Sequence, residues 1–151
     1  MLGRARRSDL RSTTLFGETF ACLFDQPSDG DALTLEEYLA RPHVRVTVAL
    51  QDDSEIDDAL ARLGHKRRIA VQVPHWSTAP ELIMGTDLIL TAARRSIEHL
   101  GYGHCSALPF RLNSFPFVQT WHRRRYNDPA HRWLRAQIEA IAGGPEGGER
   151  A

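Results

Sequence analysis

Several features that would point to a particular class of protein are missing from this sequence. No apolar run approaches the roughly 20 residues that a membrane-spanning helix needs, and the amino-terminal region has no hydrophobic segment of the signal-peptide kind. An excess of charge is also missing, because 19 basic and 19 acidic residues give a formal net charge of zero. Free-standing nucleic-acid binders usually carry a basic excess. We therefore expect a soluble, cytoplasmic protein that is not a free-standing nucleic-acid binder.

Cysteine is scarce, since Cys22 and Cys105 are far apart in a chain of 151 residues. Neither belongs to a CxxC pair or to a Cys/His group with the spacing of zinc ligands, which argues against a zinc module. Cys22 lies in an apolar run and is predicted to be a small core residue. We expect no metal and no cofactor. The hydrophobic fraction of 42% is enough for one core, either of a single domain or of part of a two-lobed one.

The clearest pattern lies between residues 68 and 92. It predicts a strand, a loop, a short helix and a second strand, over residues 69–73, 74–77, 78–84 and 88–90. The first strand should end at Pro74, because proline cannot donate a hydrogen bond to a sheet ladder. Thr78 and Glu81 have the spacing of a capping box, which is the signal for the helix.

The other elements follow from similar patterns. Strands are predicted over residues 10–16, 19–24, 44–50, 106–108 and 115–121. Helices are predicted over residues 35–40, 55–63, 94–100 and from Asp128 onwards. The helix over 55–63 should bury Ile56, Leu60 and Leu63, and the last helix carries an apolar stripe of Trp133, Leu134, Ile138 and Ile141. Because strands and helices alternate between residues 44 and 100, we expect an α/β fold with a mostly parallel central sheet flanked by helices.

A small-molecule site is predicted where the parallel strands end, since ligands of open α/β sheets bind at the carboxyl ends of strands. The candidate residues are Leu50, Gln51, Val73, Pro74, His75, Trp76, Thr78 and Thr91. The free N–H groups at the start of the helix over 78–84 could receive a carboxylate. In the alternative interpretation, Trp76 packs in the core and His75 is a loop residue bonded to backbone.

Two charged clusters each allow two interpretations. Asp52, Asp53, Asp57 and Asp58 either favour the positive end of the helix over 55–63 or hold a metal ion, and the first is simpler. The run Arg123, Arg124 and Arg125 either binds phosphate or forms a solvated turn before the last helix, and the solvated turn is simpler.

Five groups of residues occur in a characteristic order: Arg41-Pro42-His43-Val44, Asp57-x-Ala59-Leu60-x-x-Leu63-Gly64, Val73-Pro74-His75-Trp76, Thr86-Asp87-Leu88-Ile89, and Asp128-Pro129-Ala130-His131-x-Trp133-Leu134-Arg135. This order resembles the effector-binding region of LysR-type transcriptional regulators, from about residue 10 to residue 141. The resemblance implies a lobe of the type II periplasmic-binding-protein kind. Residues 10–142 would be lobe two, with crossover strands near 15–24 and 117–122 and a last helix that belongs to a truncated lobe one. Residues 1–9 would be a basic flexible start and residues 143–151 a flexible tail.

The resemblance also implies a function. The chain would be a non-enzymatic regulatory domain that binds a small anionic or aromatic effector in an inter-lobe cleft and so modulates transcription of target genes. DNA would be bound only through a helix-turn-helix domain that is absent from this chain. A homo-oligomer, or a pairing with another family member, is expected, and no membrane contact.

Two alternatives remain. The first is a stand-alone domain that binds a small molecule or another protein without a DNA role. The second is a hydrolase-like enzyme that uses His104 and Cys105. We disfavour the enzyme, because neighbouring side chains on a strand point to opposite faces of the sheet.

Overall fold

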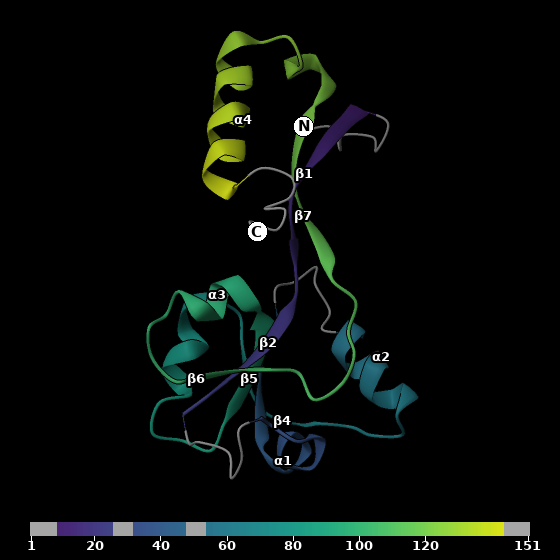
Figure 1. The fold of residues 1–151 in the computed structure, drawn as a ribbon, viewed down its shortest axis with the longest axis vertical. Coiled ribbons are helices and arrows are strands. Elements are labelled where there is room, and N and C mark those ends of the chain that lie inside the picture. The colour runs from purple at the N-terminus through teal and green to yellow at the C-terminus, as the bar shows by residue number, and fades with distance from the viewer. Residues whose placement is uncertain (1–8, 26–31, 48–53, 144–151) are drawn as a thin grey trace, which may run out of the picture. The chain divides into compact units, whose positions relative to one another are not determined.

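The computed structural model describes residues 9–25, 32–47 and 54–143 (Figure 1). The chain divides into two compact units: unit 1 is Met1–Glu18 with Ser114–Ala151, and unit 2 is Thr19–Asn113. Within the described ranges, no helix has both the length and the apolar character that crossing a bilayer requires.

Unit 2 is built on a five-stranded sheet in the order β4-β3-β5-β2-β6. The strands are β2 (Phe20–Phe24), β3 (Pro42–Val46), β4 (Arg68–Val73), β5 (Ile89–Ala93) and β6 (His104–Ala107). Strand β3 is parallel to both β4 and β5, whereas β2 is antiparallel to β5 and β6. Four of the five strands therefore run in one direction, which confirms the expected α/β fold with a mostly parallel sheet. The predicted strand over 44–50 begins two residues earlier, at Pro42, and residues 48–53 lie outside the described part of the chain.

The sheet has a core on each of its faces because alternate residues of β2 point in opposite directions. Ala21 and Leu23 belong to a first cluster of buried residues, which includes Ile97 of α3 (Arg94–Glu98). Cys22 and Phe24 belong to a second cluster, which includes residues of α1 (Leu35–Ala40) and α2 (Ser54–Arg62). We call these the first and second faces of the sheet. The expected burial of Cys22 is confirmed, since its side chain is fully buried.

Helix α1 forms for the local reason that the sequence indicates. The Thr34 hydroxyl accepts a hydrogen bond from the Glu37 backbone N–H at 3.2 Å, and the Glu37 carboxylate accepts one from the Thr34 N–H at 2.8 Å. The predicted capping box and the helix bounds are both confirmed.

The prediction for α2 is right for two of its three apolar residues. Ile56 and Leu60 are buried, but Leu63 is 51% exposed, so its predicted burial is wrong. The helix ends at Arg62, and the Leu60 carbonyl accepts a hydrogen bond from the His65 N–H at 2.9 Å across Gly64, whose φ is 77°. Leu63 thus follows the last helical turn, where the spacing of the buried face no longer applies.

The predicted helix over 78–84 is wrong. Its place is taken by two short 3₁₀ turns, η2 (Trp76–Thr78) and η3 (Pro80–Leu82). Thr78 lies inside the first turn rather than before a helix, so its side chain does not cap η3, which instead begins after Ala79. Ala79, Pro80 and Ile83 are buried, and this anchoring of the segment on the first face decides its conformation.

Unit 1 is an antiparallel ribbon of β1 (Leu10–Glu18) and β7 (Phe115–His122), followed by η4 (Arg123–Arg125) and α4 (Pro129–Ala142). The predicted strand over 10–16 is longer in the structure, since β1 continues through Gly17 to Glu18. The Phe16 and Phe117 rings stack in the ribbon with centroids 5.0 Å apart. The predicted cap is confirmed, because the Asp128 carboxylate accepts hydrogen bonds from the N–H groups of the first turn of α4.

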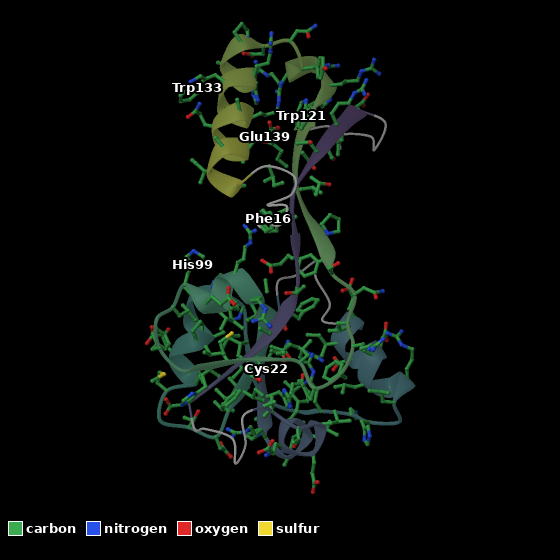
Figure 2. The ribbon with its side chains drawn as sticks, viewed as in Figure 1. Phe16, Cys22, His99, Trp121, Trp133 and Glu139 are labelled. Atoms are coloured by element: carbon green, nitrogen blue, oxygen red, sulfur yellow. The ribbon has the colours of Figure 1, made fainter. Side chains whose placement is uncertain are left out.

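The apolar stripe of α4 is mostly exposed. Trp133, Leu134 and Ile141 are 64%, 47% and 86% exposed. Helix α4 instead turns another side to the ribbon, where the Gln119 amide of β7 donates a hydrogen bond to the Glu139 carboxylate at 2.6 Å (Figure 2). In unit 1, the half-buried positions of the helix are therefore largely polar ones.

Candidate functional site

The parallel strands β3 and β4 end side by side, and this places the predicted loop. The Thr47 backbone N–H, just after β3, donates a hydrogen bond to the carbonyl of Val73, the last residue of β4, at 2.8 Å. Pro74 and His75 follow immediately and are exposed. Trp76 is half-buried and packs against the core of the first face. The loop therefore rests on the core through Trp76 while its polar residues face outward.

Thr47 adds a polar group that the sequence analysis missed. Its Oγ1 atom is buried and has no hydrogen-bond partner among the described residues. Buried hydroxyls without a partner are uncommon in proteins. The sequence placed Thr47 in the middle of a strand over 44–50, where a threonine is unremarkable as a strand former. Because β3 ends at Val46, Thr47 lies at the edge where β3 and β4 end.

Thr91 lies elsewhere. It is 7% exposed and directly opposite Cys22 in the pairing of β5 with β2. Its hydroxyl is bonded to the Tyr38 hydroxyl at 2.9 Å and lies 3.8 Å from the Cys22 sulfur. Since Tyr38 and Cys22 belong to the second face, whereas Trp76 packs on the first face, the structure does not bring Thr91 together with the loop. Thr78 is exposed on the loop, and Leu50 and Gln51 lie outside the described residues.

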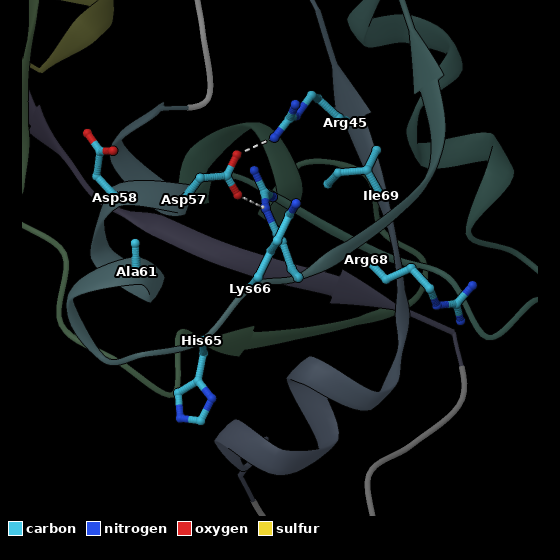
Figure 3. A pocket seen from close by; sticks show the side chains of 9 residues that line it. Arg45, Asp57, Asp58, Ala61, His65, Lys66, Arg68 and Ile69 are labelled. Carbon is cyan, nitrogen blue, oxygen red and sulfur yellow. Dashed lines mark hydrogen bonds and ion pairs between the residues drawn. The ribbon is translucent and has the colours of Figure 1, made fainter.

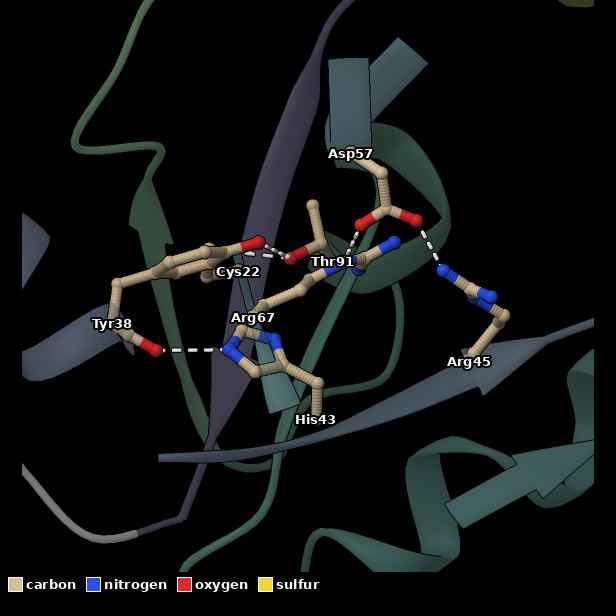
Figure 4. A network of polar contacts seen from close by, with 7 residues as sticks. All are labelled: Cys22, Tyr38, His43, Arg45, Asp57, Arg67 and Thr91. Carbon is tan, nitrogen blue, oxygen red and sulfur yellow. Dashed lines mark hydrogen bonds and ion pairs between the residues drawn. The ribbon is translucent and has the colours of Figure 1, made fainter. Parts of the chain in front are cut away.

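A buried polar network occupies the second face (Figure 4). The Nε2 atom of His43 is 2.8 Å from the Tyr38 carbonyl oxygen, and the two rings meet edge to face with centroids 4.5 Å apart. Burial raises the pKa of the Tyr38 hydroxyl to about 12 and the pKa of the Cys22 thiol to about 12, so both stay neutral at physiological pH. Burial lowers the pKa of His43 from 6.5 to about 4. Tyr38, Cys22 and His43 are therefore uncharged at physiological pH, and the charged side chains of Arg45, Asp57 and Arg67 lie beside them in the same network (Figure 4).

Beside these uncharged groups, the Asp57 carboxylate of α2 contacts two arginines, one in β3 and one just before β4. Asp57 in the first turn of α2 forms an ion pair with Arg45 of β3 and accepts a hydrogen bond from Nε of Arg67 at 2.7 Å (Figure 3). The Arg67 side chain is only 1% exposed, whereas that of Asp57 is 36% exposed. We call this group the Asp57 clamp. Asp57 lies in the first turn of α2, as the sequence interpretation expects, and the structure adds its two arginine partners.

A hollow of about 640 Å³ surrounds the Asp57 clamp. It is lined by Arg45, Asp57, Asp58, Ala61, His65, Lys66, Arg67, Arg68 and Ile69. Small-molecule pockets are mostly apolar, and this lining is mostly charged. The hollow also includes the first residues of β4, whereas the loop follows its last residue. Among the described residues, no group of three or more His, Cys, Asp or Glu side chains could hold a metal ion.

His104 and Cys105, the basis of the enzyme alternative, lie next to each other on β6. The His104 ring stacks on Phe24 with centroids 6.0 Å apart. Partial burial raises the pKa of the Cys105 thiol. A nucleophilic cysteine needs a lowered pKa, so this arrangement gives the enzyme alternative no support.

Comparison with known proteins points to one family. The family model described as "LysR substrate binding domain" matches residues 1–142. The transcriptional activator NahR of Pseudomonas putida is 31% identical over 123 residues, which cover 76% of this chain and 39% of NahR. NagR of a Ralstonia species is 31% identical over 126 residues, which cover 80% of this chain and 42% of NagR. The chain thus spans about two fifths of the length of these relatives.

Solved structures give the same result. The regulatory domain of MexT from Pseudomonas aeruginosa superposes with a TM-score of 0.77 and 29% identity, over 88% of this chain and 68% of that chain. The effector-binding domain of QuiR in complex with shikimate has a TM-score of 0.69 at 12% identity, over 93% of this chain and 69% of that chain. At 12% identity, the similarity to the QuiR domain shows a shared fold.

The Asp57 clamp predicts a stability difference between two neighbouring aspartates. Asp57→Asn removes the negative charge beside the buried Arg67 guanidinium, and we expect it to lower the free energy of unfolding by about 2 kcal/mol. Asp58→Asn removes the same charge from an exposed residue of the same helix and should change it by less than about 0.5 kcal/mol. Urea unfolding followed by circular dichroism measures both. Equal effects of the two substitutions would contradict the role given to the clamp.

The lowered pKa of His43 predicts a pH dependence of stability. In the unfolded chain His43 takes up a proton near pH 6.5, whereas in the folded chain it does so only near pH 4. Folding is therefore progressively disfavoured as the pH falls from 6.5 to 4, by about 3 kcal/mol in total. His43→Gln keeps a donor for the Tyr38 carbonyl and should remove this part of the pH dependence, while the exposed control His65→Gln should keep it. Unfolding free energies at several pH values give the slopes, and identical slopes for the two variants would rule the assignment out.

Proposed function

Because this chain belongs to the LysR substrate-binding domain family, whose model matches residues 1–142, we propose that it is the effector-binding domain of a LysR-type transcriptional regulator. The domain binds a small molecule and thereby modulates transcription in the cytoplasm. The relatives NahR and NagR, both described as transcriptional activators, support this assignment. In the whole regulator, specific DNA recognition would come from a helix-turn-helix domain outside these 151 residues.

One observation carries the proposed position of the effector. The ends of β3 and β4 are joined by the hydrogen bond from Thr47 N–H to the Val73 carbonyl, and the exposed Pro74-His75 segment begins at this point. Trp76 follows this edge with a half-buried indole, and Thr47 lies at it with a hydroxyl that has no hydrogen-bond partner among the described residues. An apolar wall with a few polar groups is what small-molecule sites provide. QuiR, which has the same fold, is described as a complex with shikimate.

The recognition chemistry differs from the one expected from sequence. The sequence offers the free N–H groups of a helix over 78–84 as one way to receive a carboxylate, but two 3₁₀ turns replace that helix. We propose that side-chain donors recognise an anionic or aromatic effector instead: the hydroxyls of Thr47 and Thr78 and the imidazole of His75. Trp76 would stack on the apolar part. Leu50 and Gln51 stay in the proposed site, whereas Thr91 would act from the buried network as a supporting residue.

The mechanism we propose is a shift of populations. An effector that binds one conformation of the domain more tightly raises the population of that conformation by its differential affinity. The loop suits such a role because Trp76 is packed on the core of the first face while its neighbours are exposed. A bound molecule that contacts Trp76 would therefore act on the core of unit 2 as well as on the loop.

The effector site can be tested by thermal shift with the 151-residue chain. A panel of small carboxylic acids and aromatic acids is screened, and a compound at about 100 times its Kd should stabilise the fold by about 2.7 kcal/mol, which is several degrees in Tm. Trp76→Ala removes the indole that forms the apolar wall of the site, and Thr47→Val removes the hydroxyl. Each should weaken binding about tenfold or more.

The matched control is Trp133→Ala, which removes an exposed tryptophan of α4. It should respond to the effector as the unmodified chain does. The proposed position of the effector is rejected if a compound stabilises the unmodified chain, Trp76→Ala and Thr47→Val equally.

The exposed side of α4 favours protein association as a second role. Trp133, Leu134 and Ile141 are largely exposed, and large apolar side chains gathered on a surface often mark a contact with another protein. A homo-oligomer, or a pairing with another regulator of the family, would cover them. Sedimentation velocity over a wide range of concentrations should show a reversible increase in mass that Trp133→Ser with Ile141→Ser abolishes. Leu63→Ser, which changes an exposed leucine of unit 2, should leave it intact, and a chain that is monomeric at every concentration would exclude this role.

A further inference from the structure

Arginines from three separate elements gather at one end of unit 1. This arginine cluster consists of Arg11 of β1, Arg123, Arg124 and Arg125 of η4, and Arg132 and Arg135 of α4. Pairing of Leu10 with His122 brings the start of β1 to the end of β7, where η4 begins. The Arg11 guanidinium lies 6.0 Å from the centre of the Tyr126 ring, which follows η4. The sequence contains only a run of three of these residues, and the fold brings the other three to it.

Two members of the arginine cluster maintain its geometry. Arg135 donates hydrogen bonds to the carbonyls of Arg125 and Tyr126, at 3.3 and 3.0 Å, and its guanidinium lies 4.5 Å from the centre of the Trp121 ring. Arg125 forms an ion pair with Asp128 at 2.9 Å. These contacts fix η4 to the first turn of α4, so the remaining arginines are presented from a defined turn and not from a loose loop.

Three of the remaining four side chains are available for a ligand. Arg123, Arg124 and Arg132 are exposed, and none of their guanidinium groups has an ion-pair partner among the described residues. The nearby acidic residues are Asp9, just before β1, and Asp128, which is already engaged with Arg125. Six positive charges thus face two negative ones at this end of unit 1, although the chain as a whole has no net charge.

We propose that the arginine cluster binds the phosphate backbone of a double-stranded nucleic acid without reading its sequence. The planar guanidinium donates two hydrogen bonds to one phosphate, and every basic residue of the cluster is arginine. Tyr126 and Asn127 are exposed beside it, and both residue types are common phosphate donors in protein–DNA interfaces. This binding lies in unit 1 and does not depend on the effector site of unit 2.

Fluorescence anisotropy of a labelled DNA duplex of arbitrary sequence, titrated with the full chain, tests the proposal. Contacts from Arg123, Arg124 and Arg132 to about three phosphates predict that the logarithm of the binding constant falls against the logarithm of salt concentration with a slope of about −3. A second duplex of different sequence should bind equally well. The triple substitution of these residues with Gln should weaken binding about tenfold or more at low salt and flatten the slope.

Two matched variants make the result decisive. Replacing Arg62, Lys66 and Arg68, three exposed basic residues of unit 2, with Gln removes the same charge and should leave binding unchanged. Replacing Arg123, Arg124 and Arg132 with Lys keeps the charge and should keep most of the affinity, with circular dichroism verifying that each variant is folded. Arg4, Arg6 and Arg7 are present in all variants, so any binding by them alone would survive in each.

Three results would overturn the proposal. They are the absence of saturable binding at low salt, an equal loss of binding in the two Gln variants, and displacement of the duplex by polyglutamate as effectively as by unlabelled duplex. The last result would assign the cluster to an acidic protein.

Discussion

The fold of unit 2 depends on the neutralisation of one buried positive charge. The Arg67 guanidinium is almost fully buried just before β4, and burying an unpaired charge costs several kcal/mol. The carboxylate that compensates it belongs to α2, and the same carboxylate also holds Arg45 of β3. One carboxylate therefore links α2 to β3 and to the residue that precedes β4. Because β3 and β4 are held together in this way, their ends meet where Thr47 contacts Val73.

The two faces of the sheet differ in the role that we assign to them: the second face supports the fold, and the first face carries the proposed binding loop. On the second face, Tyr38, His43, Cys22 and Thr91 lie within a buried network, and burial keeps the tyrosine, the histidine and the thiol uncharged at physiological pH. On the first face, Trp76 packs on apolar residues and the loop around it stays exposed. A buried hydrogen-bonded network supports a rigid fold, whereas an exposed loop on a rigid core is the usual place for binding. This contrast separates Thr91 from the other candidate residues of the site.

In unit 1, by contrast, polar side chains of α4 face the ribbon and large apolar side chains are exposed. The helix α4 turns polar positions such as Glu139 to the ribbon and leaves Trp133 and Ile141 exposed, while the arginine cluster occupies the end of the same ribbon. A surface with an apolar stripe and a separate cationic end is suited to contacts with other molecules, because Trp133 and Ile141 are largely exposed and the cationic end carries more arginines than acidic partners within the described residues of unit 1. The neutral composition of the chain hides this separation, since the positive charges of unit 1 are offset elsewhere in the sequence.

The sequence by itself determined the features that depend on neighbouring residues. The caps at Thr34 and Asp128, the burial of Cys22, most of the strands and the order of the α/β elements are local, because each follows from spacing within one or two turns or along one strand. The order of motifs also indicated the family. Only the tertiary structure decided the rest. Packing of Ala79 and Ile83 replaced a helix with two 3₁₀ turns, and strand pairing turned Thr91 toward the second face.

The exposed side of α4, the hydroxyl of Thr47 and the convergence of six arginines were likewise decided by partners far away in the chain. The physical reason is that a capping or alternation pattern is a property of adjacent residues. Whether a side chain is buried, satisfied or close to another charge depends instead on elements that only folding brings next to it.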